Sequence, residues 1–177
     1  MSPGVAPQGK IPALDFKKAL HEASAINERA NQLLLNNIPD VAWRVGKGRT
    51  AAHIHHIDLM WLSACEKSAK APAKLPPDKA THQEVQTALK ERSDACGSLK
   101  QKVLDDPAGK LANYKLNLVA FVGYLITLDS HHRGQVTKLA RQLGHPVDPK
   151  AADGLWEWGP LWHNCGFDHR SRGSSSR

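Results

Sequence analysis

Apolar residues recur at steps of three and four along four long segments of this chain, which is the spacing of one face of an α-helix. The first segment begins at Asp15 and stops before Pro39, because proline cannot continue a helix. Its apolar positions are Phe16, Leu20, Ala23, Ile26, Ala30, Leu33 and Leu34. This segment therefore predicts a first amphipathic helix.

The second segment follows a loop that contains Trp43 and Gly48. Thr50 is a good N-cap residue, because its hydroxyl can accept a hydrogen bond from the backbone of the first turn. We therefore expect the second helix to run from Ala51 to about Lys70. A proline-rich stretch separates it from the third helix.

Capping and stop residues bound the third and fourth helices. Thr81 and Glu84 form a capping box, which predicts that the third helix starts there, and Pro107 ends it. The fourth helix is predicted over residues 113–143. Gly144 follows as its C-terminal stop.

Four long amphipathic helices, with no strand of consequence, predict an all-α fold, a four-helix bundle. The proline-rich linker between the second and third helices can support a crossover connection. A chain of 177 residues fits one domain. We expect a flexible N-terminal segment over residues 1–12, the bundle over 13–166, and a flexible basic tail over 167–177.

Composition narrows the class of protein. Hydrophobic residues make up 41% of the chain and charged residues 23%, which is a globular balance. No apolar run reaches the roughly 18 residues that span a bilayer. Residues 1–12 also lack the apolar centre of a secretory signal. A cytoplasmic protein without a membrane partner is therefore expected.

Charge and cysteine content argue against further classes. The net charge of +7 permits nucleic-acid binding, but the lysines are scattered and no recognition-helix pattern is present. We therefore expect no nucleic-acid partner. Three widely spaced cysteines argue against both a disulfide framework and a thiolate zinc site. They are Cys65, Cys96 and Cys165.

The ten histidines are chemically distinctive, and five of them fall in two clusters. His131 and His132 form the cluster in the fourth predicted helix. Position 132 continues the apolar stripe of that helix, so it should face the core. A buried histidine needs a partner for each ring nitrogen, and a metal ion or a hydrogen bond can supply one. The stripe is Leu118, Phe121, Leu125, Leu128, His132, Val136, Leu139 and Leu143.

The other cluster is His53, His55 and His56, near the start of the second helix. Residues two apart point about 200° apart on a helix. We expect His53 or His56 to face inward with Met60, and His55 to lie near the surface. The helix dipole favours a neutral His53, the form that binds metal. Bundles hold metals between facing helices, so His53 and His132 are candidate ligands.

Several segments resemble the DinB/YfiT-like superfamily of metal-dependent helical-bundle proteins. The resemblance covers roughly residues 15 to 160. Its segments are G-R-T-A-A-H-I-H-H-I-D-L-M-W-L at 48–62, H-H-R-G-Q-V at 131–136, R-Q-L-G-H-P at 141–146 and L-W-E-W-G at 155–159.

The resemblance implies a site of three histidines for a divalent metal, nickel or zinc. One histidine lies early in the second helix and matches His53. Two lie four residues apart on the fourth helix, and the later one matches His132. The earlier position is Leu128 here, so weak or substoichiometric metal is expected. The candidates for the third metal ligand are Asp129, His56, His131 and water.

The resemblance also implies a thiol-dependent S-transferase, in which the metal lowers the pKa of a small thiol such as bacillithiol or mycothiol. Its partners would be that thiol and a small-molecule substrate. Gln135 is then a candidate cofactor-site residue that would orient a metal ligand by a hydrogen bond without contacting the metal itself. The alternative is a non-catalytic bundle that has lost its metal and acts as a binding or interaction module, which Leu128 favours.

Two further features have structural interpretations. Arg133 can pair with an acid such as Glu157, and Gly134 can let a neighbouring element approach. The tryptophans after the fourth helix can cap the bundle or form a homodimer interface. They are Trp156, Trp158 and Trp162.

Overall fold

The computed structural model describes residues 15–46, 49–66, 74–76, 79–106 and 110–167, with all their side chains except those of 44–54, 57 and 58. Residues 1–14 and 168–177, on which the two predicted flexible ends fall, lie outside the described residues. The described chain folds into helices and contains no strand. The predicted all-α class is therefore confirmed.

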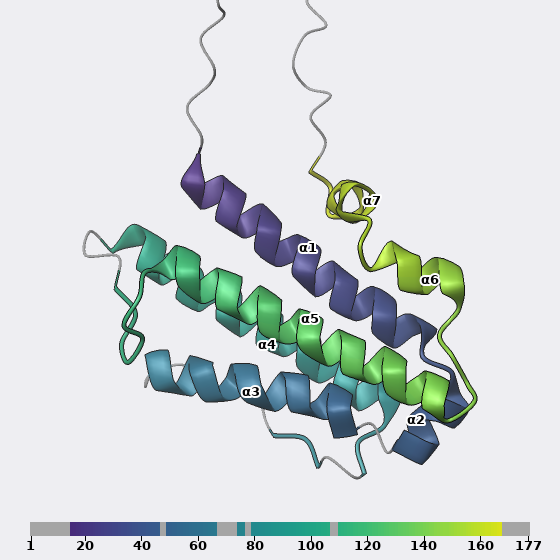
Figure 1. Ribbon diagram of the computed structural model, residues 1–177. Coiled ribbons are helices and arrows are strands. Elements are labelled where there is room, and N and C mark those ends of the chain that lie inside the picture. The colour runs from purple at the N-terminus through teal and green to yellow at the C-terminus, as the bar shows by residue number, and fades with distance from the viewer. Residues whose placement is uncertain (1–14, 47–48, 67–73, 77–78, 107–109, 168–177) are drawn as a thin grey trace, which may run out of the picture.

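Four long helices pack side by side and form the bundle (Figure 1). Each of the three with a described N-cap is capped by a side chain, and Thr81 is the one predicted as a cap from the sequence. The three capping residues are Asp15, Thr81 and Asn117. The four helices are α1 (Phe16–Asn37), α3 (Arg49–Cys65), α4 (His82–Asp105) and α5 (Leu118–Gln142).

The two central helices along the chain, α3 and α4, run in the same direction. Lys17 at the start of α1 pairs with Asp105 at the end of α4, so α1 and α4 are antiparallel. Glu66, just after α3, pairs with Lys102 near the end of α4, so α3 and α4 end together. The chain must therefore return along the bundle between them, and the predicted crossover connection is confirmed.

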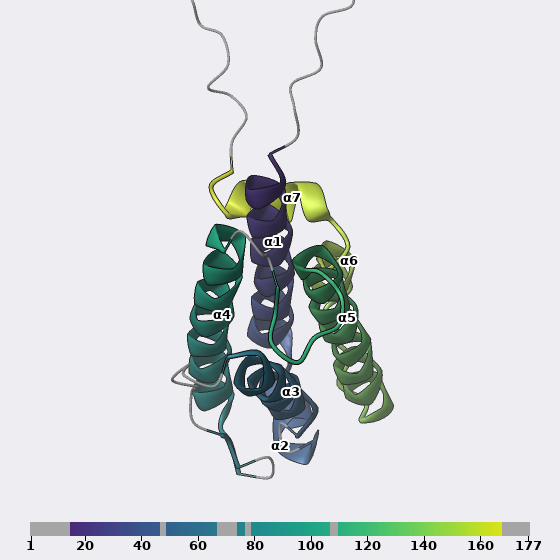
Figure 2. The same ribbon diagram turned by 90° about the vertical axis from the view of Figure 1, so that its left-hand side faces the viewer.

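Three short helices complete the fold: α2 (Asp40–Gly46), α6 (Pro149–Gly154) and α7 (Trp158–Asn164). In Figure 2, α7 lies across the N-terminal half of α1. Trp162 donates a hydrogen bond from Nε1 to Glu22, so it helps to attach α7 to the bundle. Trp156 is 77% exposed. A homodimer interface at this tryptophan stays a prediction.

Several predicted boundaries need correction. Residues 40–46 form α2, where a loop was predicted. The third long helix in the chain does begin at the capping box of Thr81. The last one begins at Leu118 instead of Asn113, because Asn113 has a φ of 56° and cannot continue a helix. Asn117 caps that helix with its side chain instead.

The apolar core is divided into two main halves. One half joins α1, α4 and the end of α5 through residues such as Leu34, Leu89 and Val136. The other joins α3, α4 and the start of α5 and includes Leu62 and Phe121. Buried polar residues lie between the halves. The candidate functional chemistry is therefore in the middle of the bundle.

Candidate functional site

A layer of buried polar side chains crosses the bundle between the two halves of the core. It contains both signs of charge and two imidazole rings. Such groups are expensive to bury unless they pair with one another. This polar layer consists of Asn27, Asn31, His55, Arg92, Asp129, His132 and Arg133, which are all at most 6% exposed.

Two asparagines of α1 bridge the acid and the guanidinium of α5. Asp129 Oδ2 accepts hydrogen bonds from Asn27 Nδ2 at 2.6 Å and from Asn31 Nδ2 at 2.7 Å. Arg133 Nη1 donates to Oδ1 of both asparagines. The two asparagines are four residues apart on α1, and Asp129 and Arg133 are four residues apart on α5. Each spacing is about one helical turn, so the two pairs have the same separation along the helix axes. The bridge therefore fixes α1 against α5.

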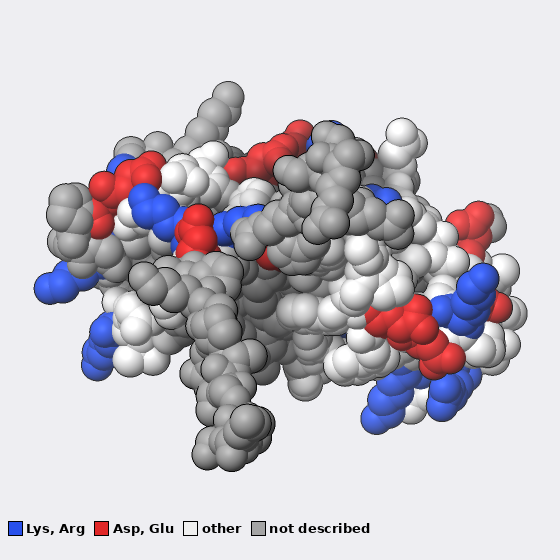
Figure 3. Space-filling model, turned by 90° about the horizontal axis from the view of Figure 1, so that it is seen from above, with Lys and Arg blue, Asp and Glu red and all other residues white. Residues whose placement is uncertain are grey.

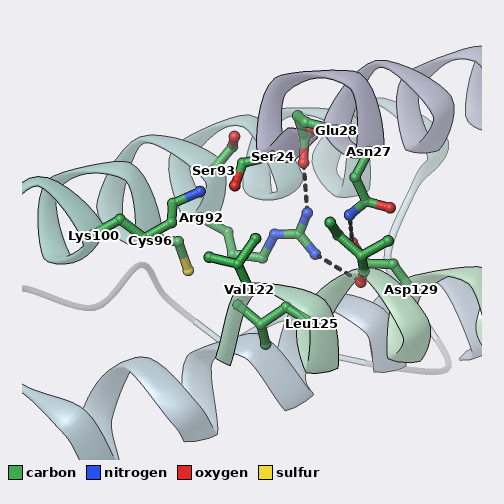
Figure 4. A pocket seen from close by; sticks show the side chains of 11 residues that line it. Ser24, Asn27, Glu28, Arg92, Ser93, Cys96, Lys100, Val122, Leu125 and Asp129 are labelled. Carbon is green, nitrogen blue, oxygen red and sulfur yellow. Dashed lines mark hydrogen bonds and ion pairs between the residues drawn. The ribbon is translucent and has the colours of Figure 1, made fainter. Parts of the chain in front are cut away.

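Arg92 connects α4 to the same group. Its Nη2 donates to Glu28 Oε2 at 2.6 Å, and its Nη1 lies 3.7 Å from Asp129 Oδ1, which is an ion pair but too long for a hydrogen bond. Figure 4 shows the Arg92 guanidinium between these two acids. Burial lowers the pKa of Arg133, and the charges of Asp129 and Glu28 oppose that change. Two acids thus balance two guanidinium groups.

Arg133 and Gly134 differ from their predicted roles. Arg133 bonds to the asparagines of α1 and to Ser130 Oγ, whereas Glu157 is exposed at the start of α7. A Cβ added to Gly134 would meet no neighbouring atom within 4 Å. The predicted pairing with Glu157 and the predicted close approach at this glycine are therefore wrong.

His132 faces the core as predicted, and Gln135 orients it. His132 is 5% exposed, and its Nδ1 lies 2.9 Å from Gln135 Oε1. Gln135 Nε2 lies 2.8 Å from Nε2 of the exposed His131. An amide oxygen only accepts, so this contact fits the tautomer of His132 with the proton on Nδ1. In that tautomer the Nε2 atom of His132 is the nitrogen that could bind a metal.

On α3 the inward histidine is His55. Its side chain is fully buried, and it shares a stripe with the buried Leu59 and Leu62. His56 is half-buried and its Nε2 accepts a hydrogen bond from the Leu75 backbone at 3.2 Å. Met60, expected to face inward, is 57% exposed. The predicted surface position of His55 is therefore wrong.

The predicted ligand His53 belongs to α3, but its side chain lies outside those described. The sequence predicts an inward face that contains His53 or His56 and Met60, whereas in the structure the buried residues Leu59 and Leu62 define that face. Positions 53 and 55 are about 200° apart on the helix. Position 53 is therefore on the opposite face of α3 from His55.

His55 and His132 are nearly level on adjacent antiparallel helices. Trp61 Nε1 lies 3.3 Å from Tyr124 Oη, which sets the register of α3 against α5. His55 is six residues before Trp61, and His132 is eight residues after Tyr124. At 1.5 Å per residue the two positions differ by about 3 Å along the bundle. Two buried imidazoles thus lie at one level of the α3–α5 seam.

A third ligand is not provided by Asp129 in its observed position. Its carboxylate is directed to α1 and α4, and a metal between α3 and α5 would have to break those contacts. Leu128, at the position of the missing histidine, is half-buried. Among the side chains described, no three histidine, cysteine, aspartate or glutamate residues form a metal-binding group.

Sequence reasoning missed the part of the polar layer that α1 and α4 contribute. Asn27 and Asn31 interrupt the apolar face of the first helix at a spacing of four. Asp129 and Arg133 have the same spacing on α5. Matching polar pairs on two amphipathic helices are a pattern that could have revealed the layer. Arg92 has no such pattern around it.

The family of the chain follows from its sequence. A model of the DinB family matches residues 20–158, which is most of the chain. No curated protein and no solved structure matches it. The chain therefore belongs to the DinB family.

Proposed function

We propose that this protein binds a divalent metal, nickel or zinc, at the α3–α5 seam through His55 and His132, and uses it in a thiol-dependent transfer reaction. The supporting observation is the buried His132, whose Nδ1 is occupied by Gln135 Oε1 at 2.9 Å. A hydrogen bond on one ring nitrogen that orients the other towards a metal is the usual arrangement of a histidine ligand.

The donor chemistry fits this proposal in part. Imidazole nitrogens suit nickel and zinc, and His55 and His132 are nearly level on facing helices. A catalytic zinc site usually has three protein ligands and an open position. Leu128 stands where the third histidine would be. The proposed site is therefore weak, and a thiol or water would fill a larger share of it than is usual.

The bound metal would stabilise the thiolate of a small thiol such as bacillithiol or mycothiol, which makes the thiol a better nucleophile. The protein's own residues orient and confine the site. Gln135 fixes the ring of His132 and spans to His131. Leu125 and Val136, one turn or two from His132, are buried and exclude water from the inner side.

The test combines metal content with a thiol-transfer assay. Protein purified without chelator is loaded with zinc and given bacillithiol and 1-chloro-2,4-dinitrobenzene. The thiolate sulfur bonds to the ring carbon, chloride leaves, and the thiol proton goes to the buffer. We expect a rate above that of thiol and zinc alone. That rate should be lost in His55→Gln and in His132→Gln but kept in His53→Gln.

The three variants also separate the candidate ligands. Loss of rate in His53→Gln, with His55→Gln active, would return the ligand role to His53. No rate in any form, together with no bound zinc, would favour a non-catalytic bundle that acts as a binding module. The half-buried Leu128 and the engagement of Asp129 with α1 are the observations that support this second candidate.

A further inference from the structure

A groove is lined by residues of α1 and α4. Figure 2 shows that these two helices lie next to each other, with α3 and α5 on the other side of the bundle. Its outer part has a volume of about 480 Å³, and an inner cavity of about 30 Å³ reaches Asp129 in the polar layer. Ser24, Ser93 and Lys100 line both parts. The groove therefore connects the bundle surface with a buried carboxylate.

Small side chains leave this space open. Ser24 and Ala25 on α1 face Ser93 and Gly97 on α4 across the groove. A Cβ added to Gly97 would meet no neighbouring atom within 4 Å. The groove is thus unfilled at a level where two packed helices normally bury large apolar residues.

The inner end of the groove offers a buried acceptor. Asp129 is 2% exposed, and its Oδ1 has no hydrogen-bond partner among the residues that the structure describes. Arg92 Nη1 is 3.7 Å from that oxygen. A hydroxyl can accept from a guanidinium and donate to a carboxylate at once, whereas an ammonium cannot accept and a carboxylate cannot donate. The inner cavity has room for a group of about that size.

The mouth of the groove carries one positively charged side chain. Lys100 brings a positive charge to both parts of the groove, and Figure 4 shows its amine on the same side as the hydroxyls of Ser24 and Ser93. Asp94 lines the outer part, so a ligand with several negative charges would be repelled. Arg92 and Lys100 are eight residues apart on α4, about 12 Å along its axis. Arg92 and Lys100 are thus at the two ends of the groove, a separation that suits a ligand with a chain of several carbons.

We propose that this groove binds a sugar acid, a polyhydroxylated chain with one carboxylate. Its terminal hydroxyl lies between Arg92 Nη1 and Asp129 Oδ1, its carboxylate lies at Lys100, and its remaining hydroxyls meet Ser24 and Ser93. The site is separate from the proposed metal site and does not depend on it. All of its measurements are therefore made with metal removed by a chelator.

The test is calorimetric titration of the full chain with gluconate, sorbitol and hexanoate. Sorbitol lacks the carboxylate and hexanoate lacks the hydroxyls. We expect gluconate to bind about tenfold or more tightly than either, because it alone satisfies both ends of the groove. Lys100→Gln should reduce gluconate affinity to that of sorbitol and leave sorbitol unchanged.

Two glycine variants give the steric test. Gly97→Leu should fill the groove and abolish gluconate binding without lowering stability, since the position is helical and open. Gly123→Leu is the matched control, because Gly123 is helical, exposed and equally open but lies outside the groove. No gluconate binding at about 10 mM, equal binding of sorbitol, or full binding by Gly97→Leu would each overturn the proposal. In the first case the inner cavity holds water only.

Discussion

Asp129 is the residue on which the polar layer depends most. Its carboxylate accepts from two asparagines of α1 and pairs with Arg92 of α4, so three helices meet at one side chain. Removing one member of a buried charge network leaves the others without compensation, which costs more than the pair contributes. The polar layer is therefore expected to be sensitive to single substitutions.

Asp129→Ala should lower the free energy of unfolding by about 3–5 kcal/mol, because the two buried guanidinium groups of Arg92 and Arg133 would then be balanced by Glu28 alone. Chemical denaturation of both forms at neutral pH measures the difference. Asp105→Ala is the control, since Asp105 pairs with Lys17 at the surface, and we expect it to change little. Equal losses in the two variants would show that Asp129 is not a centre of the fold.

At this scale the sequence predicted the burial of His132 but not that of Arg133. Periodicity identified position 132 because apolar residues flank it on the stripe. The same reasoning places charged residues outside, so Asp129 was considered only as a ligand and Arg133 as a partner for Glu157. His55 was misplaced because the inward face of α3 was set from its histidines and Met60 instead of from Leu59 and Leu62.

Among the helices, α4 has the most complete local determinants. Thr81 Oγ1 accepts from the Glu84 backbone, and Glu84 Oε2 accepts from the Thr81 backbone at 2.7 Å. The Thr81 backbone N–H and the Thr81 hydroxyl both donate to Glu84 Oε2, and these two hydrogen bonds lower the pKa of Glu84. A lowered folded-state pKa stabilises the protein above the ordinary value for a glutamate, and that contribution is lost as the pH falls through the lowered value.

Thr81→Ala should destabilise the protein by about 1 kcal/mol at neutral pH, because the first turn of α4 loses its side-chain acceptor. Thr127→Ala is the control. Thr127 is exposed within α5, and its hydroxyl donates to the Gly123 backbone of the same helix. Thermal unfolding compares the two. A Thr81→Ala midpoint no lower than that of Thr127→Ala would contradict the importance of the capping box.

The acid range gives a second readout of this element. Wild type should lose this stability as the pH falls below the ordinary glutamate range and through the lowered pKa of Glu84, because its carboxylate is then protonated and its bonds to Thr81 weaken. In Glu84→Gln this part of the pH dependence should be absent. Unfolding midpoints measured between pH 3 and pH 7, in roughly half-unit steps, compare the two forms. Identical pH profiles would show that Glu84 does not contribute.

Element prediction succeeded where caps and periodicity agreed and failed where they did not. Thr81 marked the start of α4, because its hydroxyl and the acid three residues on form one motif. The start of α5 was misjudged because Asn113 and Asn117 are both suitable caps, and only Asn117 precedes continuous helix. The seven-residue α2 is too short for its periodicity to be recognised.

At the scale of the molecule, the charged side chains of the described residues are mixed in sign on the face that Figure 3 shows. Figure 3 shows Lys and Arg side chains interspersed with Asp and Glu over the described surface of one face. Several surface lysines, such as Lys17 and Lys102, are paired with acids. Within the described residues, no helix is long and apolar enough to cross a membrane.

We therefore expect no strong binding to duplex DNA in spite of the net charge of +7. Affinity that rests on phosphate contacts requires clustered cations and falls steeply with salt. Fluorescence anisotropy with a short labelled duplex at about 0.15 M salt measures it. Sub-micromolar binding with a steep salt dependence would contradict this expectation.

The central claim is that a degenerate metal site lies at the α3–α5 seam, and thermal unfolding with and without zinc tests it most directly. Leu128→His restores a ligand one turn before His132. Without metal the free energy of unfolding of this variant should be lower by about 1–3 kcal/mol, because a polar ring replaces a half-buried leucine. Zinc should offset that loss by binding the folded state. It should raise the unfolding midpoint of wild type only slightly. If zinc shifts neither form, His55 and His132 are ordinary hydrogen-bonded core residues and the claim is wrong.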